Sequence, residues 1–187
     1  MIRSPCDPDD ESVWTAANTI TAAEAGAFQL HTTVNGIGER AGNASLEELL
    51  VALQMKKGIE RYDLSLLKRL SGMVEKYSGI ALPRNKPVTG ELAFSHESGI
   101  HIAAILENPA AYEYFPPGLV GGERHFILGK HTGKKALEHV VASMGCELSE
   151  KQICRVLDLV KDHSEQKCNI TPEVLKRLIR KAKESPA

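Results

Sequence analysis

The chain has 187 residues, 42% hydrophobic and 25% charged, proportions that are typical of a globular protein and exclude wholesale disorder. Its formal net charge of −1 gives no general attraction to nucleic acid or to an acidic membrane, so neither is an expected partner. The sequence has no hydrophobic run of membrane-spanning length and no signal-peptide pattern, and we therefore expect a cytoplasmic protein.

The first third of the chain predicts a helix followed by a strand. Residues 1–12 are polar and irregular, and the Ala-rich stretch Trp14–Ala25 predicts a helix that Gly26 ends. Phe28–Val34 alternates hydrophobic and polar residues, which is typical of a strand. One strand between helices forms no sheet alone. It is either the edge of a larger α/β architecture or it pairs with another chain.

A glycine-dense loop follows, and it leads into a second predicted helix. The loop contains the run GIGERAG, which is one residue too long for a dinucleotide fingerprint and lacks the Lys-Ser/Thr of a phosphate loop. Its spacing alone favours a tight strand-to-helix connection. Ser45 and Glu48 have capping-box spacing. The helix after them carries one hydrophobic face, formed by Leu46, Leu49, Leu50 and Leu53.

The rest of the chain is mainly helical in prediction. Asp63–Ser78 and His101–Glu107 predict helices, the stretch 80–99 predicts loops, and His125–Leu128 is a short strand candidate. Three helices are then expected, at Lys135–Met144, Ser149–His163 and Pro172–Lys183, with Thr171 as the N-cap of the last. The four cysteines, Cys6, Cys146, Cys154 and Cys168, include no C-x-x-C pair, so free thiols are expected.

Three long motifs in order resemble the homocitrate synthase and 2-isopropylmalate synthase family. They are VNGIGERAGNASLEELLVAL from residue 34, GELAFSHESGIH at 90–101 continued by ILENPAAYEYFPPGLVG at 105–121, and ERHFILGKHTGKKAL at 123–137. The resemblance implies an α/β fragment, the last strand and helices of a (β/α)8 barrel followed by mainly helical subdomains. The implied divisions are 1–58 for the end of the barrel, 59–133 for a linker helix and loop-rich subdomain, and 134–187 for a helical subdomain.

The family condenses an acyl-CoA with a 2-oxo acid bound to a divalent metal. The resemblance therefore implies Mg²⁺, Mn²⁺ or Zn²⁺ as cofactor and acetyl-CoA as co-substrate, because a metal polarises the ketone and holds the carboxylate. By motif position it implies His101 and Tyr112 as catalytic residues and Asn43 as a metal ligand. Glu39, Arg40 and His96 are implied substrate-side residues, with His96 ranked below His101. A cluster of basic residues can meet coenzyme A phosphates or form a solvated face: Arg124, Lys130, His131, Lys134 and Lys135.

Two departures from the family pattern set the functional alternatives. The family's Asp motif and its oxo-acid Arg are not found in this sequence, and Asp7 and Asp9 stand where the family has His-x-His. Carboxylates bind Mg²⁺ or Mn²⁺, but the same residues also fit an irregular start, and neither is assigned as a ligand.

We therefore expect the C-terminal part of a split homocitrate synthase, completed by an N-terminal barrel chain, a homodimer partner or both. The absence of a further regulatory domain favours the nitrogen-fixation or archaeal type. The alternatives are a portion of a 2-isopropylmalate or citramalate synthase, a non-catalytic protein that binds a complete synthase, and a decayed remnant.

Overall fold

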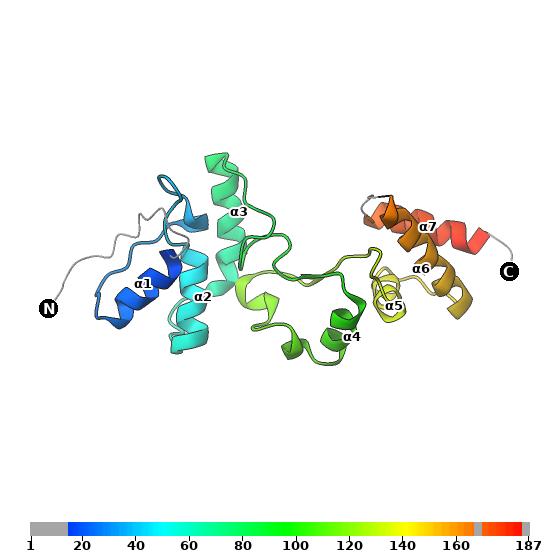
Figure 1. The fold of residues 1–187 in the computed structure, drawn as a ribbon, viewed down its shortest axis with the longest axis horizontal. Helices are drawn as coiled ribbons and strands as arrows, with labels where there is room; N and C mark the ends of the chain where they lie inside the picture. Colours follow the sequence, from blue (N-terminus) through cyan, green and yellow to red (C-terminus); the bar gives the residue numbers. More distant parts are fainter. Residues whose placement is uncertain (1–14, 167–169, 185–187) are drawn as a thin grey trace. The chain divides into compact units, whose positions relative to one another are not determined.

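The computed structural model describes residues 15–166 and 170–184, and their fold is mainly helical (Figure 1). These residues form two compact units. The first unit draws on Met1–Ala93 and Pro117–Glu123, and the second draws on Phe94–Pro116 and Arg124–Ala187. The N-terminal residues 1–14, with Cys6, Asp7 and Asp9, lie outside the described residues, as does Cys168.

The helices of the first unit are α1 (Thr15–Glu24), α2 (Leu46–Lys57) and α3 (Leu67–Ser78), with the 3-10 turn η2 (Leu64–Leu66) directly before α3. The three predicted helices are confirmed. Glycines in the left-handed region follow all three, because a residue without a Cβ adopts positive φ at little cost. The buried hydrophobic residues of this unit are Ala44, Leu49, Val51, Leu64, Leu67 and Val120. The last of these lies on η4 (Pro117–Val120), which contacts η2.

The strand predicted for Phe28–Val34 is wrong. The structure has no strand there, but an isolated parallel bridge between Thr33 and Ser45, followed by the 3-10 turn η1 (Val34–Gly36). Thr33 accepts from Leu46 N–H and donates to Ala44 C=O, both at 3.0 Å. A strand needs a neighbouring ladder to satisfy its backbone groups, and no neighbouring strand in the described part of the chain extends this bridge.

The capping box predicted at Ser45 and Glu48 is also wrong. Ser45 is the N-cap of α2 but makes no side-chain cap bond. Its hydroxyl donates instead to Glu47 Oε2 at 2.5 Å, and Glu48 pairs with Lys86 Nζ at 2.5 Å. Of the four leucines predicted to form the hydrophobic face of α2, Leu49 is buried and the other three are half-buried, while Glu47 and Val51 are also buried.

The second unit begins with a small parallel sheet beside a helix. The strands β1 (Ser95–His96) and β2 (His125–Phe126) pair with Ser95 opposite His125 and His96 opposite Phe126. Between them lie α4 (Gly99–Glu107) and the 3-10 turn η3 (Pro109–Ala111). The predicted helix and the strand candidate are thus confirmed with slightly different bounds.

Three helices complete the second unit: α5 (Lys134–Ser143), α6 (Glu150–Glu165) and α7 (Pro172–Glu184). They share one hydrophobic core. Thr171 caps α7 as predicted, because its Oγ1 accepts from Val174 N–H at 3.3 Å. The core residues are Leu128, Leu137, Val141, Ile153, Val156, Val160, Leu175, Leu178, Ile179 and Ala182.

The structure also bears on the expectations about membrane spans and cysteines. Among the described helices, none combines the length and the apolar character that a membrane crossing demands. Cys146 and Cys154 are free thiols, as expected from their spacing.

Candidate active site

The glycine loop of the first unit folds closely on itself. A Cβ added at Gly42, whose φ is +94°, would lie 2.3 Å from the carbonyl oxygen of Gly36. A Cβ at Gly38 would lie 2.7 Å from Asn43 Nδ2. The loop is also tied by Asn43 N–H, which donates to Gly36 C=O at 3.0 Å. The density of glycines is therefore a packing requirement of this turn.

Asn43 carries a buried side-chain oxygen in this loop. Its Oδ1 is buried, and no partner is within hydrogen-bond distance in the described residues. A buried amide oxygen without a partner is costly, and amide oxygens are ligands that hard divalent metals accept. No group of three or more His, Cys, Asp or Glu residues that could hold a metal occurs among residues 15–166 and 170–184. Asn43 thus fits a single metal ligand, not a complete site.

Glu39 and Arg40 lie on the exposed tip of the same loop. The carbonyl of Glu39 accepts from Gly42 N–H at 2.8 Å, and Arg40 has a φ of +50°. Positive φ is uncommon for a residue with a Cβ and marks a constrained turn. The structure places both side chains at the surface of the loop that carries Asn43.

A buried network that the sequence did not indicate supports this loop from beneath. Glu47 is 0% exposed, and its Oε1 accepts from Asn35 N–H at 2.8 Å. The Asn35 side chain in turn donates to Ser71 C=O at 3.0 Å and accepts from Ser71 Oγ at 2.5 Å. These bonds connect the loop to both α2 and α3. Glu47 follows Ser45 in a run of helix-forming residues, so no local signal distinguished it from a surface glutamate.

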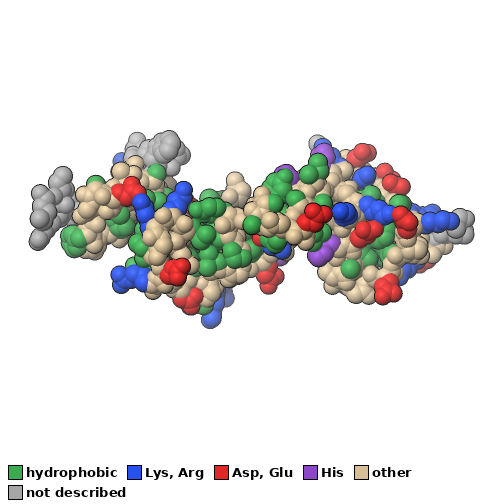
Figure 2. All heavy atoms as spheres, turned by 90° about the horizontal axis from the view of Figure 1, so that it is seen from below, with side chains coloured by type: hydrophobic (Ala, Val, Ile, Leu, Met, Phe, Trp, Pro, Cys, Tyr) green, Lys and Arg blue, Asp and Glu red, His purple; other side chains and the backbone are tan. Residues whose placement is uncertain are grey.

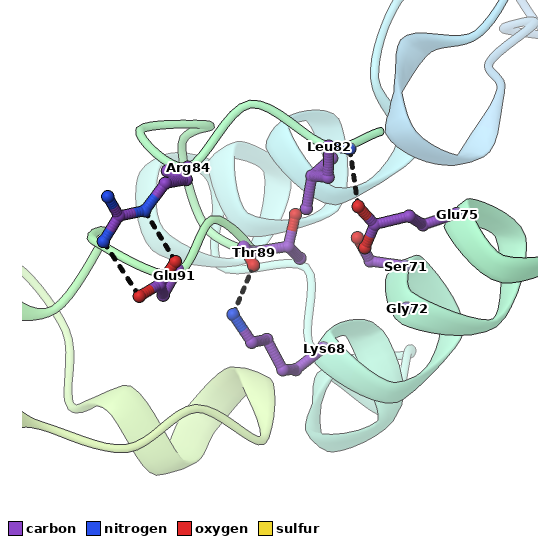
Figure 3. Close-up of a pocket in the computed structure, with 8 residues that line it drawn as sticks. All are labelled: Lys68, Ser71, Gly72, Glu75, Leu82, Arg84, Thr89 and Glu91. Atoms are coloured by element: carbon purple, nitrogen blue, oxygen red, sulfur yellow. Dashed lines mark hydrogen bonds and ion pairs between the residues drawn. The ribbon is translucent and has the colours of Figure 1, made fainter. Parts of the chain in front are cut away.

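A pocket of about 240 Å³ lies beside α3 in the first unit (Figure 3). Its charged groups are already paired within it: Lys68 Nζ donates to Thr89 C=O, Arg84 forms a bidentate pair with Glu91 at 2.7 and 3.0 Å, and Glu75 accepts from Leu82 N–H at 2.7 Å. None of the predicted site residues lines it.

The second unit brings His101 and Tyr112 together. Their ring centroids are 4.2 Å apart with an interplanar angle of 31°. His101 lies on α4, Tyr112 ends the turn η3, and both side chains are exposed. An imidazole moves protons near neutral pH, and a phenol donates a hydrogen bond beside it. This pair is therefore equipped for acid–base chemistry on a molecule that reaches this surface.

A charged cluster lies next to this pair. Glu113 forms two hydrogen bonds of 2.6 Å with Arg124, from Nε and Nη2, and its side chain is 4% exposed. The Arg124 hydrogen bonds hold the pKa of Glu113 below its usual range. His96 Nε2 lies 3.7 Å from Glu113 Oε1 and has no hydrogen-bond partner in the described residues. Burial lowers the pKa of His96, the opposing attraction of Glu113 being smaller.

The basic cluster predicted from residues 124–135 is largely paired with carboxylates. Arg124 binds Glu113, Lys134 pairs with Glu150, and Lys135 lies 3.7 Å from Glu107. Lysine and arginine side chains held in this way are less available to phosphates, which favours the interpretation of a solvated face.

Known protein families match both parts of the chain. Residues 9–74 match the HMGL-like family, and residues 88–168 match the family described as homocitrate synthase post-HMGL domain-like. The chain thus carries an HMGL-like segment followed by a homocitrate synthase post-HMGL segment, which confirms the resemblance seen in its motifs. The first of these segments relates the chain to (β/α)8 barrel proteins.

Curated relatives agree with these matches. The chain is 55% identical over 176 residues to the homocitrate synthase AksA of Methanosarcina mazei, covering 94% of this chain and 44% of that protein. It is 43% identical to a probable 2-isopropylmalate synthase of Ignicoccus hospitalis, over 90% of this chain and 42% of that protein. A putative (R)-citramalate synthase CimA of Methanopyrus kandleri is 42% identical over 90% of this chain and 33% of that protein. The chain therefore spans less than half the length of these relatives.

Proposed function

We propose that the chain is the C-terminal portion of an acyl-CoA/2-oxo-acid condensing enzyme, and specifically of a homocitrate synthase that joins acetyl-CoA to 2-oxoglutarate in amino-acid biosynthesis. The observation that carries the proposal is the contact between His101 and Tyr112, whose rings lie 4.2 Å apart on an exposed surface. The similarity to homocitrate synthases supports the choice of reaction class.

The two residues have distinct roles in this reaction. Condensation begins when a base removes a proton from the thioester methyl group, and the resulting enolate attacks the ketone carbon of the oxo acid. Hydrolysis of the thioester then releases coenzyme A. His101 is proposed to take the proton from the thioester methyl group and to return a proton to the alkoxide that forms at the former ketone carbon, a transfer for which an imidazole is suited. Tyr112 orients the imidazole by ring contact and offers its hydroxyl to the developing oxyanion.

The other site residues implied by the resemblance serve the metal and the substrate. Asn43 would supply one oxygen ligand to a divalent metal, which polarises the ketone and binds the carboxylate of the oxo acid when it is present. The other ligands must come from a different chain or from outside residues 15–166 and 170–184. Glu39 and Arg40 lie on the same loop and are proposed to face the substrate, as is His96 in the second unit.

Exposed hydrophobic surface supports the proposal of a partner chain. Figure 2 shows hydrophobic side chains at the surface between charged ones. Met73 and Tyr77 of α3 are 45% and 79% exposed, and Leu66 of η2, directly before α3, is 54% exposed. Exposed large hydrophobic residues at helical spacing are typical of a protein interface. We propose that an N-terminal barrel chain of a split synthase covers this face and completes the barrel, either alone or within a dimer of assembled enzymes.

The test is co-expression of this chain with a candidate N-terminal barrel chain that carries the family's Asp motif. Free thiol is measured after addition of acetyl-CoA with 2-oxoglutarate, 2-oxoisovalerate or pyruvate in turn. We expect thiol release with 2-oxoglutarate, and none from this chain alone. His101→Ala should lower turnover by about 10²- to 10⁴-fold, the range typical of a lost acid–base group.

His125→Ala is the matched control, because His125 is an exposed histidine of the same unit on the strand β2. If the turnover of His101→Ala equals that of His125→Ala, His101 has no part in the proposed mechanism. Preference for 2-oxoisovalerate or pyruvate would assign the chain to a 2-isopropylmalate or citramalate synthase. Inhibition of a complete synthase by this chain, with no activity in any assembly, would instead support a non-catalytic binding role.

A further inference from the structure

The pair formed by Glu113 and Arg124 occupies a distinctive place in the second unit. Glu113 directly follows Tyr112 in the chain, and Arg124 directly precedes β2. The two hydrogen bonds between them are both 2.6 Å, which is the parallel geometry that a guanidinium and a carboxylate form at their strongest. The Glu113 side chain is only 4% exposed and that of Arg124 is 30% exposed, so the carboxylate is better shielded from solvent than that of an ordinary surface ion pair.

This pair connects the segment that carries Tyr112 to the small sheet that precedes the helix of His101. Arg124 joins Glu113 to β2, and β2 pairs with β1 through His96 and Phe126. Three residues after β1 the helix α4 begins, and it carries His101. From the other direction, the turn η3 leads through Tyr112 back to Glu113. The position of the Tyr112 ring relative to His101 therefore depends on where Glu113 is held.

The other bonds around Tyr112 do not fix its side chain. Tyr112 and Glu113 N–H both donate to Pro109 C=O, at 3.2 and 3.0 Å, and Asn108 Oδ1 accepts from Ala110 N–H at 3.1 Å. These bonds shape the turn locally. They do not connect the turn to α4 or to the sheet, and the Tyr112 side chain is 48% exposed. Among the hydrogen bonds described for residues 108–116, the two that Arg124 donates to Glu113 are the ones that reach the β2 end of the unit, and His96 lies 3.7 Å from the same carboxylate.

His96 contacts the same carboxylate from the strand β1. Its Nε2 lies 3.7 Å from Glu113 Oε1, which is longer than a hydrogen bond, and the groups that face it are Glu113, Arg124 and His101. Burial lowers the pKa of His96, and the hydrogen bonds from Arg124 are the main cause of the lowered pKa of Glu113.

We propose that Glu113 and Arg124 are positioning residues, which act by holding Tyr112 in contact with the imidazole of His101. The proposal rests on the proposed function for its catalytic consequence, but the contact itself is a property of this chain. A ring that moves by about 1 Å from its productive position costs on the order of 100-fold in rate.

The test uses the full chain with isotope-labelled histidine and tyrosine. The nuclear Overhauser effect between the ring protons of His101 and Tyr112 is measured in wild type, Glu113→Gln and Arg124→Gln. We expect its loss in both variants and its partial retention in Arg124→Lys, which keeps the charge but not the bidentate geometry. The amide spectrum of α5–α7 reports whether each variant is folded. An undiminished effect in folded Glu113→Gln would overturn the proposal.

The matched control is the bidentate pair Arg84–Glu91 of the first unit, whose side chains are more than 60% exposed. Arg84→Gln and Glu91→Gln should leave the ring contact unchanged. In the assembled enzyme, Glu113→Gln should lower kcat on the order of 100-fold with a much smaller change in KM for acetyl-CoA. If Glu113→Gln loses the ring contact but no assembly of the wild-type chain is active, the proposed function is refuted and the positioning role is not. If folded Glu113→Gln keeps the full kcat, the positioning role is refuted and the proposed function is not.

Discussion

Single glycines control the shape of the loop that carries Asn43. We predict that Gly42→Ala lowers the free energy of unfolding by about 3 kcal/mol, because the new Cβ meets a backbone oxygen in addition to the strain of positive φ. Gly58→Ala is the matched control. Gly58 also has positive φ, at +67°, but a Cβ there meets nothing within 4 Å, so a loss of about 1 kcal/mol is expected. Urea unfolding followed by circular dichroism measures both, and equal losses would contradict the crowding seen in the loop.

His96 and Glu113 make the stability of the second unit depend on pH. Both have a pKa below the ordinary value, so the unfolded chain binds protons more readily than the folded one. The free energy of unfolding should therefore fall as pH drops below about 6.5, through His96, and fall further below about 4.3, through Glu113.

The contribution of His96 is isolated by substitution. In His96→Gln the loss of stability between pH 7.5 and pH 5.5 should be smaller than in wild type, since one titrating group is gone. Urea unfolding at the two pH values measures it. If the two proteins lose the same amount, protonation of His96 does not oppose folding.

At the scale of elements, the capping-box pattern stands at the start of α2 and of α6 but forms a capping box only at α6. At Ser149 the box is complete: Ser149 Oγ accepts from Gln152 N–H at 3.4 Å, and Gln152 Oε1 accepts from Ser149 N–H at 2.9 Å. At Ser45 the hydroxyl instead donates to the buried carboxylate of Glu47, and Glu48 forms an ion pair with Lys86. Local spacing predicts the helix start in both cases. It does not reveal which tertiary partners compete for the capping side chains.

We predict that Ser149→Ala lowers the free energy of unfolding by about 1 kcal/mol, the usual cost of a lost N-cap. Ser143→Ala is the control, because Ser143 donates to Val140 C=O within the same unit and caps no helix start. Its effect should lie within about 0.5 kcal/mol of zero. Thermal unfolding of the two variants in parallel gives the comparison, and a Ser149→Ala protein as stable as Ser143→Ala would show that the box contributes little.

The other elements also divide into those that the local sequence predicts and those that depend on tertiary partners. The periodic patterns gave the helices α1 to α7 to within a few residues, and Thr171 with Pro172 located the start of α7. The stretch 28–34 has the composition of a strand, but a strand exists only beside a neighbour. The motif implied His101 and Tyr112 as catalytic residues but not the contact between their rings. The hydrogen bonds from Arg124 to Glu113 join residues eleven positions apart and have no local signature.

At the scale of the whole molecule, the helices differ in how completely they bury their hydrophobic residues. The helices α5, α6 and α7 enclose a core of their own, whereas α3 leaves large hydrophobic side chains exposed. We predict that amide hydrogen exchange in the chain alone is slowest in α6 and α7 and faster in α2 and α3.

Addition of the N-terminal barrel chain should slow exchange in α3 and leave α6 and α7 unchanged, because only the former carries the face that we propose is covered. Mass spectrometry of peptides from each helix measures this protection. A buffer-only sample and an unrelated barrel protein serve as controls. Protection confined to α6 and α7 would place the partner on the other unit.

The path of the chain between the two units has a practical consequence for cutting the protein apart. The polypeptide passes from one unit to the other at residues 93/94, 116/117 and 123/124. A protease that cleaves at 93/94 therefore splits the first unit, because residues 117–123 stay with the C-terminal fragment, and only the packing within that unit holds the two fragments together. A truncation that starts at residue 94 would carry η4 without η2, the turn it contacts, and would expose Val120, which is 0% exposed in the intact chain. Excising the second unit cleanly requires replacing residues 117–123 with a short polar linker.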